Sequence, residues 1–267
     1  MSFPPVSLST RSTRDSVARQ ETPELSIIVP AFNEEQRLPK TLESIRAYLK
    51  SRSLRAEVLV IDDGSTDATA KAVEHVQKCF PELQLISNGQ NRGKGFSVRR
   101  GMLAARGEIA LFTDADLSAP IEEADKLLAV LHEGAYDGAI GSRALDRSLI
   151  EVRQSAFRER AGILFNRIVR GLTGLPFEDT QCGFKAFRRE RARVLFEQQR
   201  SEGFGFDPEI LFLAQRAGLR VAEVPVRWAH HPATKVNLVR DSVHMFADLL
   251  AVRWNAWMGR YSREPRR

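Results

Sequence analysis

The segment from residue 25 to residue 65 reads LSIIVPAFNEEQRLPKTLESIRAYLKSRSLRAEVLVIDDGS. It contains a short apolar run, Leu25–Val29, a stretch with apolar residues at helical spacing, Leu38–Leu49, and a second apolar run, Val58–Ile61. Short apolar runs bounded by turn residues are typical of buried strands, so this pattern predicts a strand–helix–strand unit. Strands joined through a helix lie parallel, and a parallel sheet is covered by helices on both faces.

The same alternation continues through the first half of the chain. Further apolar runs occur at Leu83–Ile86, Ile109–Phe112 and Ala139–Ile140, and helical patterns occur at Asp67–Val76, Phe96–Ala105 and Ile121–Leu131. We therefore predict an α/β fold with a mostly parallel, Rossmann-like sheet. In such sheets ligands bind beyond the carboxyl ends of the strands, which is where we look for chemistry.

The pattern changes after Glu151. A basic helix (Arg153–Leu172), a helix ending at Ala217, a strand (Arg220–Trp228) and a final helical segment (Val239–Met258) are expected. Residues 1–22, rich in Ser, Thr, Arg and Pro, are expected to be a disordered tail. The predicted division is therefore a tail at 1–22, one domain at 23–235, and an amphipathic helix with a basic tail at 236–267.

Composition excludes several classes of protein. The 267 residues carry a formal net charge of +6, which is compatible with an anionic partner. The two cysteines, Cys79 and Cys182, lack a metal-ligand spacing, which argues against a zinc site or disulfide framework and fits a reducing compartment. No apolar stretch is long enough to span a membrane.

Two carboxylates follow the strand predicted at Ile109–Phe112. Asp114 and Asp116 are two residues apart, and in extended chain such residues face the same way and can converge on one cation. Oxygen ligands of this kind suit Mg²⁺ or Mn²⁺. The alternative is that one of them caps a helix beginning near Pro120.

Other polar clusters follow the neighbouring strands. Asp62 and Asp63 end the second strand, where one carboxylate could accept a hydrogen bond from a nucleobase or ribose while the other caps the next helix. Glu34, after the first strand, matches a helix dipole on its own. Lys94, between Gly93 and Gly95, offers a positive charge to a phosphate.

Several familiar motifs are absent from the sequence. The Lys94 loop lacks the glycine and Ser/Thr spacing of a P-loop, and Val98 stands where a dinucleotide-binding fingerprint needs its last glycine. No nucleophile-elbow motif is present, and His230–His231 is expected to lie in a plain loop. The sequence therefore favours a reaction that needs no strong base.

In this order, the clusters resemble the family-2 glycosyltransferases of the GT-A fold. The motifs that carry the resemblance are Val29–Glu34, Asp62–Ser65, Asn91–Gly95 and Asp114–Asp116, and it covers about Leu25 to Arg143. Gly141–Arg143, Asp179–Lys185, Thr234–Val236 and Asp241–Ser242 further resemble dolichyl-phosphate β-glucosyltransferases and their bacterial polyprenyl-phosphate relatives. The family usually has Gly-Ser-Lys-Val where this chain has Ala233–Val236.

The resemblance implies an inverting transfer of a sugar, glucose from UDP-glucose, to a polyprenyl phosphate with Mg²⁺ or Mn²⁺. It implies that the nucleotide sugar is bound by Pro30, Asn33, Glu34, Asp62, Asp63, Lys94 and Asp114 and the metal by Asp114 and Asp116. It also implies a bacterial-type enzyme without the amino-terminal anchor of the eukaryotic members, cytoplasmic and peripheral on the inner face of the membrane.

The acceptor phosphate would meet Arg143, a residue we also expect to act in catalysis with Asp116. Arg158 or Arg160 of the basic helix would assist, and Gln181 and Lys235 are also expected to bind the acceptor. The alternative for the two helix arginines is an ordinary solvated helix face. A phosphate monoester is largely dianionic at neutral pH and can attack without a general base. If the acceptor is instead a soluble hydroxyl, Asp207 or Glu209 would act as the base.

A non-catalytic nucleic-acid binder is disfavoured, because carboxylate clusters repel a phosphate backbone. The last helical segment instead suggests contact with an anionic membrane surface. Its apolar residues recur at steps of three and four, and tryptophans and arginines gather at its end: Val239, Val243, Phe246, Leu250, Trp254 and Trp257 form the stripe, and Met245, Leu249, Val252 and Ala256 widen it. The alternative is that this stripe packs against the domain or a second subunit.

Overall fold

A computed structural model describes residues 22–152, 156–230 and 238–261, with side chains described from residue 162 in α5 and from residue 244 in α8. The strands are β1 (Leu25–Ala31), β2 (Ala56–Asp62), β3 (Leu83–Ser87), β4 (Ile109–Phe112), β5 (Gly138–Ser142), β6 (Ile150–Val152), β7 (Lys185–Arg188), β8 (Val221–Pro225) and β9 (Trp228–Ala229). The helices are α1 (Leu38–Arg52), α2 (Thr69–Gln77), α3 (Lys94–Ala104), α4 (Ala124–His132), α5 (Ala156–Thr173), α6 (Arg189–Gln198), α7 (Phe206–Arg216) and α8 (Leu238–Trp257), with 3-10 turns η1 (Ile121–Glu123) and η2 (Arg147–Leu149).

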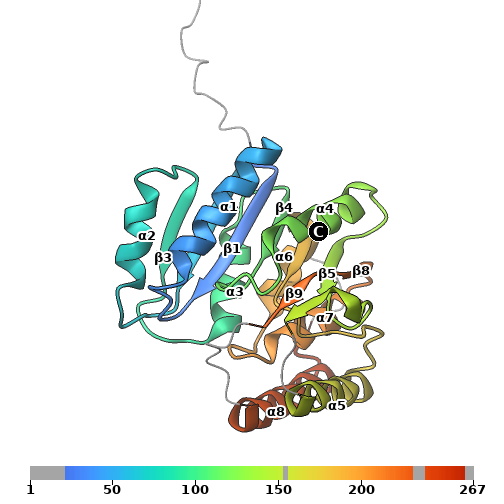
Figure 1. Ribbon diagram of the computed structural model, residues 1–267. Coiled ribbons are helices and arrows are strands. Elements are labelled where there is room, and N and C mark those ends of the chain that lie inside the picture. Colours follow the sequence, from blue (N-terminus) through green and yellow to red (C-terminus); the bar gives the residue numbers. More distant parts are fainter. Residues whose placement is uncertain (1–21, 153–155, 231–237, 262–267) are drawn as a thin grey trace, which may run out of the picture.

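Seven of the described strands form one sheet in the order β3-β2-β1-β4-β7-β5-β8 (Figure 1). All of its neighbouring pairs are parallel except those made by β7, which runs antiparallel to both β4 and β5. The predicted α/β class with a mostly parallel sheet is confirmed. The reversed strand β7 was not predicted, because its four residues, KAFR, are too few to give a periodic signal.

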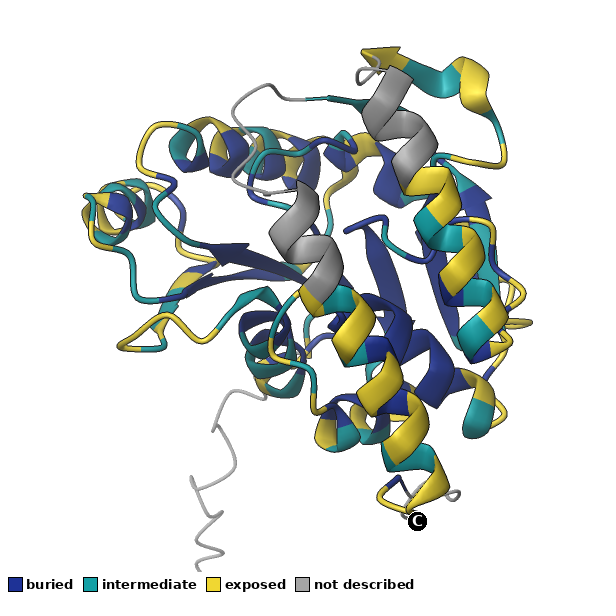
Figure 2. Cartoon of the chain, turned by 90° about the horizontal axis from the view of Figure 1, so that it is seen from below, coloured by how far each residue is buried: buried dark blue, intermediate teal, exposed yellow. Residues whose placement is uncertain are grey.

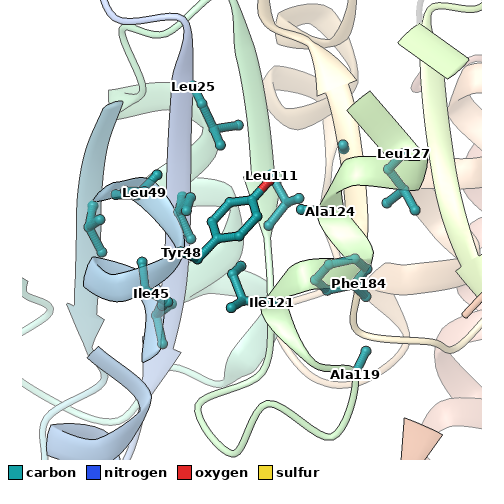
Figure 3. Packing of buried hydrophobic residues seen from close by; sticks show 14 of the residues in the cluster. Leu25, Ile45, Tyr48, Leu49, Leu111, Ala119, Ile121, Ala124, Leu127 and Phe184 are labelled. Atoms are coloured by element: carbon teal, nitrogen blue, oxygen red, sulfur yellow. The ribbon is translucent and has the colours of Figure 1, made fainter. Parts of the chain in front are cut away.

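Side chains of alternate residues in β1 point to opposite faces of the sheet and join two separate cores. Ile27 and Val29 pack with α1, α2 and α4, whereas Ile28 packs with α3, α6 and α7. Figure 3 shows the first of these cores, where Ile45 and Tyr48 of α1 meet Leu111 of the sheet. The two covered faces explain why the strands read as continuous apolar runs.

The helix α1 illustrates how local sequence fixes an element. Pro39 stands in its first turn, where a missing backbone N–H costs nothing, and buried residues recur every three or four positions from Leu38 to Leu49. Ser53 ends the helix in the left-handed conformation, with φ of 52°. The predicted helix Leu38–Leu49 is therefore present and runs one turn longer.

The strand predicted at Arg220–Trp228 is divided in two. The segment β8 pairs with β5 as far as Pro225, and β9 then pairs with β6 in a separate two-stranded sheet. The backbone N–H of Arg227 donates to the carboxylate of Glu123 at 3.1 Å, so the chain leaves the large sheet at that point.

The helices α5 and α8 pack against each other and lie along one side of the molecule (Figure 1). Seen from that side, exposed residues run along the outer surfaces of both helices (Figure 2). No helix in the described part of the chain has the length and apolar character needed to cross a membrane. The predicted tail at 1–22 and the boundary at 235 and 236 fall on or next to residues outside those described.

Candidate functional site

The polar residues predicted from the sequence lie at the carboxyl edge of the sheet. The strands β1, β2 and β4 are parallel neighbours, with Pro30 beside Ile61 and Ala31 beside Asp62. The loops that follow these strands therefore start at the same edge. Pro30 is buried in β1, so its contribution is to the end of this strand rather than to an exposed surface.

Asn33 joins the loop after β1 to the loop after β2. Its side-chain oxygen accepts hydrogen bonds from the backbone N–H of Thr66 at 2.8 Å and of Asp67 at 3.4 Å, and its own backbone has a positive φ of 56°. Glu34 donates its backbone N–H to Thr69 Oγ1 at 2.7 Å and forms an ion pair with Arg37. Both residues thus shape this part of the site.

Asp63 organises the loop that carries Lys94. Its carboxylate accepts hydrogen bonds from the backbone N–H of Arg92 at 3.0 Å and of Gly93 at 2.8 Å, and from the side-chain amide of Asn88 at 2.8 Å. The side chain is buried, which makes these three partners important for its charged form. Asp63 therefore sets the position of the loop between β3 and α3.

Asp62 is also buried, and its carboxylate accepts the backbone N–H of Ser65 at 3.2 Å. The idea that one of these two aspartates caps the next helix is wrong within the described contacts. The backbone N–H of Thr69, the first residue of α2, donates instead to Asp67 at 2.9 Å. This leaves Asp62 as the member of the pair whose carboxylate accepts fewer hydrogen bonds from the described residues.

Lys94 forms an ion pair with Asp114, with Nζ and Oδ1 2.5 Å apart. Burial lowers the pKa of Lys94, but the carboxylates of Asp114 and Asp207 outweigh that effect, so the pKa is raised and the lysine stays charged. The ammonium also lies 6.0 Å from the centre of the Phe206 ring.

A second ion pair lies directly behind the first. Lys185 is fully buried in β7, where its ammonium donates to Cys182 O at 2.6 Å and pairs with Asp207. Burial raises the pKa of Asp207, and the ammonium groups of Lys185 and Lys94 oppose that rise. The charges alternate along the row Lys185, Asp207, Lys94 and Asp114.

Sequence reasoning assigned no role to Lys185. The available signal was its position between Phe184 and Ala186 in an otherwise apolar stretch, since a lysine in such a stretch is buried only when it is paired. Asp207, predicted as a base for a hydroxyl acceptor, has this ammonium as its partner.

Asp116 lies two residues beyond Asp114, in the turn that follows β4. Its Oδ1 accepts the backbone N–H of Ser118 at 3.0 Å, and Thr41 Oγ1 bonds to the carbonyl of Ala115 at 2.6 Å, which anchors the turn to α1. The carboxylate of Asp114 fits against Gly183, where an added Cβ would lie 2.3 Å from Oδ2. Any side chain at Gly183 would therefore displace Asp114.

The described residues contain no group of three or more His, Cys, Asp or Glu side chains arranged to hold a metal. Asp114 and Asp116 thus supply two carboxylates at most. Their oxygen chemistry fits Mg²⁺ or Mn²⁺, provided that a diphosphate and water complete the octahedral shell, as is usual for Mg²⁺. The residues present fit a metal that is bound together with a phosphorylated ligand.

Arg143 is held in a fixed orientation by Asp179. Two side-chain hydrogen bonds join them, from Nε to Oδ2 at 2.6 Å and from Nη2 to Oδ1 at 2.9 Å, and the guanidinium lies 5.4 Å from the ring centre of Trp228. Burial raises the pKa of Asp179, but the guanidinium of Arg143 lowers it more strongly, to about 2. The backbone N–H of Asp179 donates in turn to Glu223 at 2.7 Å.

A small pocket lies beside Asp114. Asp114, Gly183, Phe184 and Trp228 are among the residues that line it. Figure 3 shows Phe184 and Ala119, which also lines the pocket, at the border of the first core. Trp228 lines this pocket and also lies beside the guanidinium of Arg143, so this one residue contacts the surroundings of both Asp114 and Arg143.

Gln181 has a buried donor without a partner. Its side-chain nitrogen is buried and makes no hydrogen bond to the described residues, while its backbone N–H donates to Asp179 at 3.1 Å. An unsatisfied buried donor costs free energy, and this one belongs to the residue directly before Cys182, which lines the pocket.

Of the remaining predicted residues, Glu209 is not brought into this group. Glu209 is buried and accepts hydrogen bonds from the backbone N–H of Arg200 at 3.0 Å and of Ser201 at 2.8 Å, and from the hydroxyl of Tyr261 at 2.6 Å. The side chains of Arg158, Arg160 and Lys235 lie outside the described part of the chain.

Comparisons with known proteins agree on one family. The model for glycosyl transferase family 2 matches residues 26–196. The dolichyl-phosphate beta-glucosyltransferase of Drosophila melanogaster is 41% identical over 245 residues, covering 86% of this chain and 74% of the relative. The human protein of the same name is 35% identical over 270 residues, covering 96% and 83%.

Among solved structures, glucosyl-3-phosphoglycerate synthase from Mycobacterium tuberculosis, in complex with Mn²⁺ and uridine-diphosphate-glucose, has a TM-score of 0.64. It is 22% identical, and the match covers 87% of this chain and 79% of that one. At this identity the likeness shows the fold alone. With the family match and the relatives above, the chain belongs to glycosyl transferase family 2 and is a glycosyltransferase of the GT-A fold.

Proposed function

We propose that this glycosyltransferase transfers glucose from UDP-glucose to a polyprenyl phosphate of the dolichyl type, with inversion at the sugar and with Mg²⁺ or Mn²⁺. The observation that carries the proposal is the guanidinium of Arg143, which Asp179 holds in place and which packs on Trp228, a residue that lines a small pocket together with Asp114. Arg143 and Asp114 are thus linked through one shared neighbour, Trp228, so a cation suited to phosphate and the carboxylate expected to face a diphosphate belong to the same region. The relatives named for dolichyl phosphate support the lipid acceptor and glucose as the sugar.

On the donor side, Asp114 and Asp116 would hold the metal, with Lys94 available to the diphosphate. A divalent cation here supplies charge neutralisation for the departing nucleoside diphosphate. Asp62, buried and with fewer contacts than Asp63, is the candidate for a hydrogen bond to the nucleoside. Asn33, Glu34 and Asp63 keep the loops around it in place.

On the acceptor side, Arg143 and the side-chain nitrogen of Gln181 would bind the lipid's phosphate. Asp179 keeps the guanidinium in one orientation, so little side-chain entropy remains to be lost on binding. A dianionic phosphate attacks without a general base, so the enzyme contributes orientation and charge rather than proton transfer. This is consistent with the engagement of Asp207 by Lys185.

The lipid acceptor requires contact with a membrane, and α5 and α8 offer the surface for it. Large apolar side chains are exposed on both helices, and we call them the apolar face: Ile163, Leu164 and Ile168 of α5, with Phe246, Leu250, Trp254 and Trp257 of α8. Together with a net charge of +6, this face favours peripheral binding to an anionic, cytoplasmic leaflet. The arrowhead of β1, its carboxyl end, points toward the side where these helices lie (Figure 1).

The direct test is incubation with a panel of UDP- and GDP-sugars, a short polyprenyl phosphate and either metal ion, with lipid products identified by mass. We expect glucosyl polyprenyl phosphate from UDP-glucose, with β configuration by NMR. A parallel reaction with phosphoglycerate and simple alcohols tests the hydroxyl-acceptor alternative. Product only in that reaction, or no lipid product with any donor, would overturn the proposal.

The acceptor assignment has its own variants. Gln181→Leu and Arg143→Lys should raise the KM for polyprenyl phosphate several-fold while slow hydrolysis of UDP-glucose continues. Gln181→Leu is the safer of the two, because no described hydrogen bond of its side chain is lost. Loss of UDP binding with an unchanged acceptor KM would show that these residues serve the donor instead.

A further inference from the structure

The ion pair between Lys94 and Asp114 occupies the position where a metal would bind its carboxylate ligand. The ammonium nitrogen lies 2.5 Å from Oδ1 of Asp114. A small divalent cation binds a carboxylate oxygen at about 2.1 Å. The ammonium and the metal therefore compete for the same oxygen, and their positive charges repel each other.

The backbone around Lys94 is pinned, so the competition cannot be relieved by moving the loop. The N–H of Gly93 is held by Asp63 at 2.8 Å. At Gly95 an added Cβ would lie 2.6 Å from the carbonyl oxygen of Ser201, which shows how closely the two segments pack. Lys94 can release Asp114 only by turning its side chain.

The neighbouring acids offer no full replacement for Asp114. Asp207 and Asp116 also attract Lys94, but Asp207 is already paired with the fully buried ammonium of Lys185, and Asp116 is the second expected metal ligand. An ammonium that leaves Asp114 would therefore lack a full counter-charge until another anion arrives. A nucleoside diphosphate, which carries its charge to this position together with the metal, supplies that anion.

We propose that Lys94 is the resident counter-ion of Asp114, that it keeps the metal affinity of the free protein low, and that it passes to the diphosphate when metal and nucleotide bind together. This rests on the proposed function for the position of the donor. Its consequence is that the nucleotide strengthens metal binding through Lys94, in addition to any direct ligands that it provides.

The test is a titration with Mn²⁺, followed by the electron paramagnetic resonance signal of the free ion, with and without UDP. Without UDP, Lys94→Met should bind Mn²⁺ more tightly than the unmodified protein by about tenfold or more, the direction and size expected when a charge a few ångströms from the ion is removed. With UDP, the gain in Mn²⁺ affinity should be smaller in the variant. Lys94→Arg keeps the charge and should behave like the unmodified protein.

Arg92→Met is the matched control, because Arg92 is two residues away in the same loop but pairs with Glu202. Its removal lowers the charge of the loop by the same amount without freeing Asp114, so its Mn²⁺ affinity should change little. Equal affinities for Lys94→Met and the unmodified protein, or equal gains for both variants, would overturn the inference. If Mn²⁺ binding follows the pattern expected above but the unmodified protein fails to glucosylate polyprenyl phosphate, only the proposed function is overturned.

Discussion

Charged side chains at this site are held by protein partners before any ligand binds. Lys185 with Asp207, and Arg143 with Asp179, are pairs in which at least one member is almost wholly buried. Such pairs contribute little net stability relative to apolar residues, but removing one partner leaves a buried charge and costs about 3–5 kcal/mol. Their value lies in orientation, which a reaction without a general base depends on.

At the residue scale, Asp116→Asn should reduce the transfer rate by about 10² to 10³-fold, the usual loss when a charge-stabilising contact to a leaving group is removed. The fold should persist, because an asparagine oxygen can still accept the hydrogen bond from Ser118. Initial rates at saturating Mg²⁺ or Mn²⁺, with circular dichroism, measure both. Glu133→Gln, an exposed acid beyond α4, is the control and should have no effect. Full activity in excess EDTA would contradict the metal requirement.

Asp179 should carry a pH-dependent part of the stability. Its pKa falls from 3.8 to about 2 on folding, so its contribution is present above about pH 4 and is lost as the pH drops through 2. A shift of this size corresponds to about 2 kcal/mol in the free energy of unfolding. Urea unfolding between pH 5 and pH 2 should show this loss, and Asp179→Asn should be less stable at pH 7 with a flatter acid limb. If the variant loses as much unfolding free energy between pH 5 and pH 2 as the unmodified protein, the assignment to Asp179 is refuted.

The sequence was enough to predict which charged residues at the strand ends belong to the site, but not which residues form ion pairs with them. Asp114 and Asp116 stand out because they directly follow a strand, and Arg143 because it follows another. Asp179, the partner of Arg143, is 36 positions away along the chain. Lys94 and Asp114 also come from separate segments, which follow β3 and β4 respectively. Pairing over such separations depends on the strand order, which local patterns do not contain.

At the scale of elements, the parallel strands and their helices were predictable because each is a periodic run of apolar residues. The short strand β7, inserted antiparallel between β4 and β5, was not, although it carries Lys185 into the core. The final helix was predicted with one apolar face. The structure divides that face: Leu249 and Val252 are buried, while Leu250 and Trp254 are exposed.

The helix α8 is tied to the donor side of the site by Asp248. Its carboxylate receives a hydrogen bond from the backbone N–H of Gly205, and a Cβ at Gly205 would lie 2.4 Å from its Oδ2. The loop that contains Gly205 also supplies the carbonyl oxygens of Ser201 and Glu202, which lie against Gly95 and Gly93 beside Lys94. The short segment from Ser201 to Gly205 thus contacts both α8 and the Lys94 loop.

We therefore expect Asp248→Ala to raise the dissociation constant for UDP several-fold, since the lost hydrogen bond, worth about 1 kcal/mol, helps to order this loop. Isothermal titration calorimetry with UDP and Mn²⁺ measures it. Arg253→Ala removes an exposed charge from the same helix and serves as the control. Weaker acceptor binding with unchanged UDP affinity would instead make α8 an acceptor element.

At the scale of the whole molecule, the carboxyl end of β1, where the predicted polar residues begin, points toward the side on which α5 and α8 lie (Figure 1). The basic helix predicted at Arg153–Leu172 was expected to supply phosphate-binding arginines. The structure adds a feature that its sequence did not suggest to us, namely that Ile163, Leu164 and Ile168 are exposed alongside the apolar residues of α8. Two packed helices present a broader surface to lipid than one helix alone.

The last prediction concerns this apolar face. A version of the chain shortened at Leu250 would lose the buried residues Val252 and Tyr261, so substitutions are the better test. The double variant Trp254→Ser and Trp257→Ser removes two exposed rings that lie 5.0 Å apart, and each ring buried in an interface contributes about 2 kcal/mol. Cosedimentation with anionic vesicles should fall by more than tenfold in the double variant.

Neutral vesicles should bind the unmodified protein less than anionic ones, because basic residues add to the attraction only at a negative surface. Tyr136→Ser, which removes an exposed ring between α4 and β5, is the control and should cosediment normally. Turnover of a short, water-soluble prenyl phosphate should be similar in the double variant, because its catalytic groups are untouched. Equal vesicle binding by all three proteins would show that the apolar face serves a contact other than lipid. Loss limited to the double variant would assign membrane binding to this face.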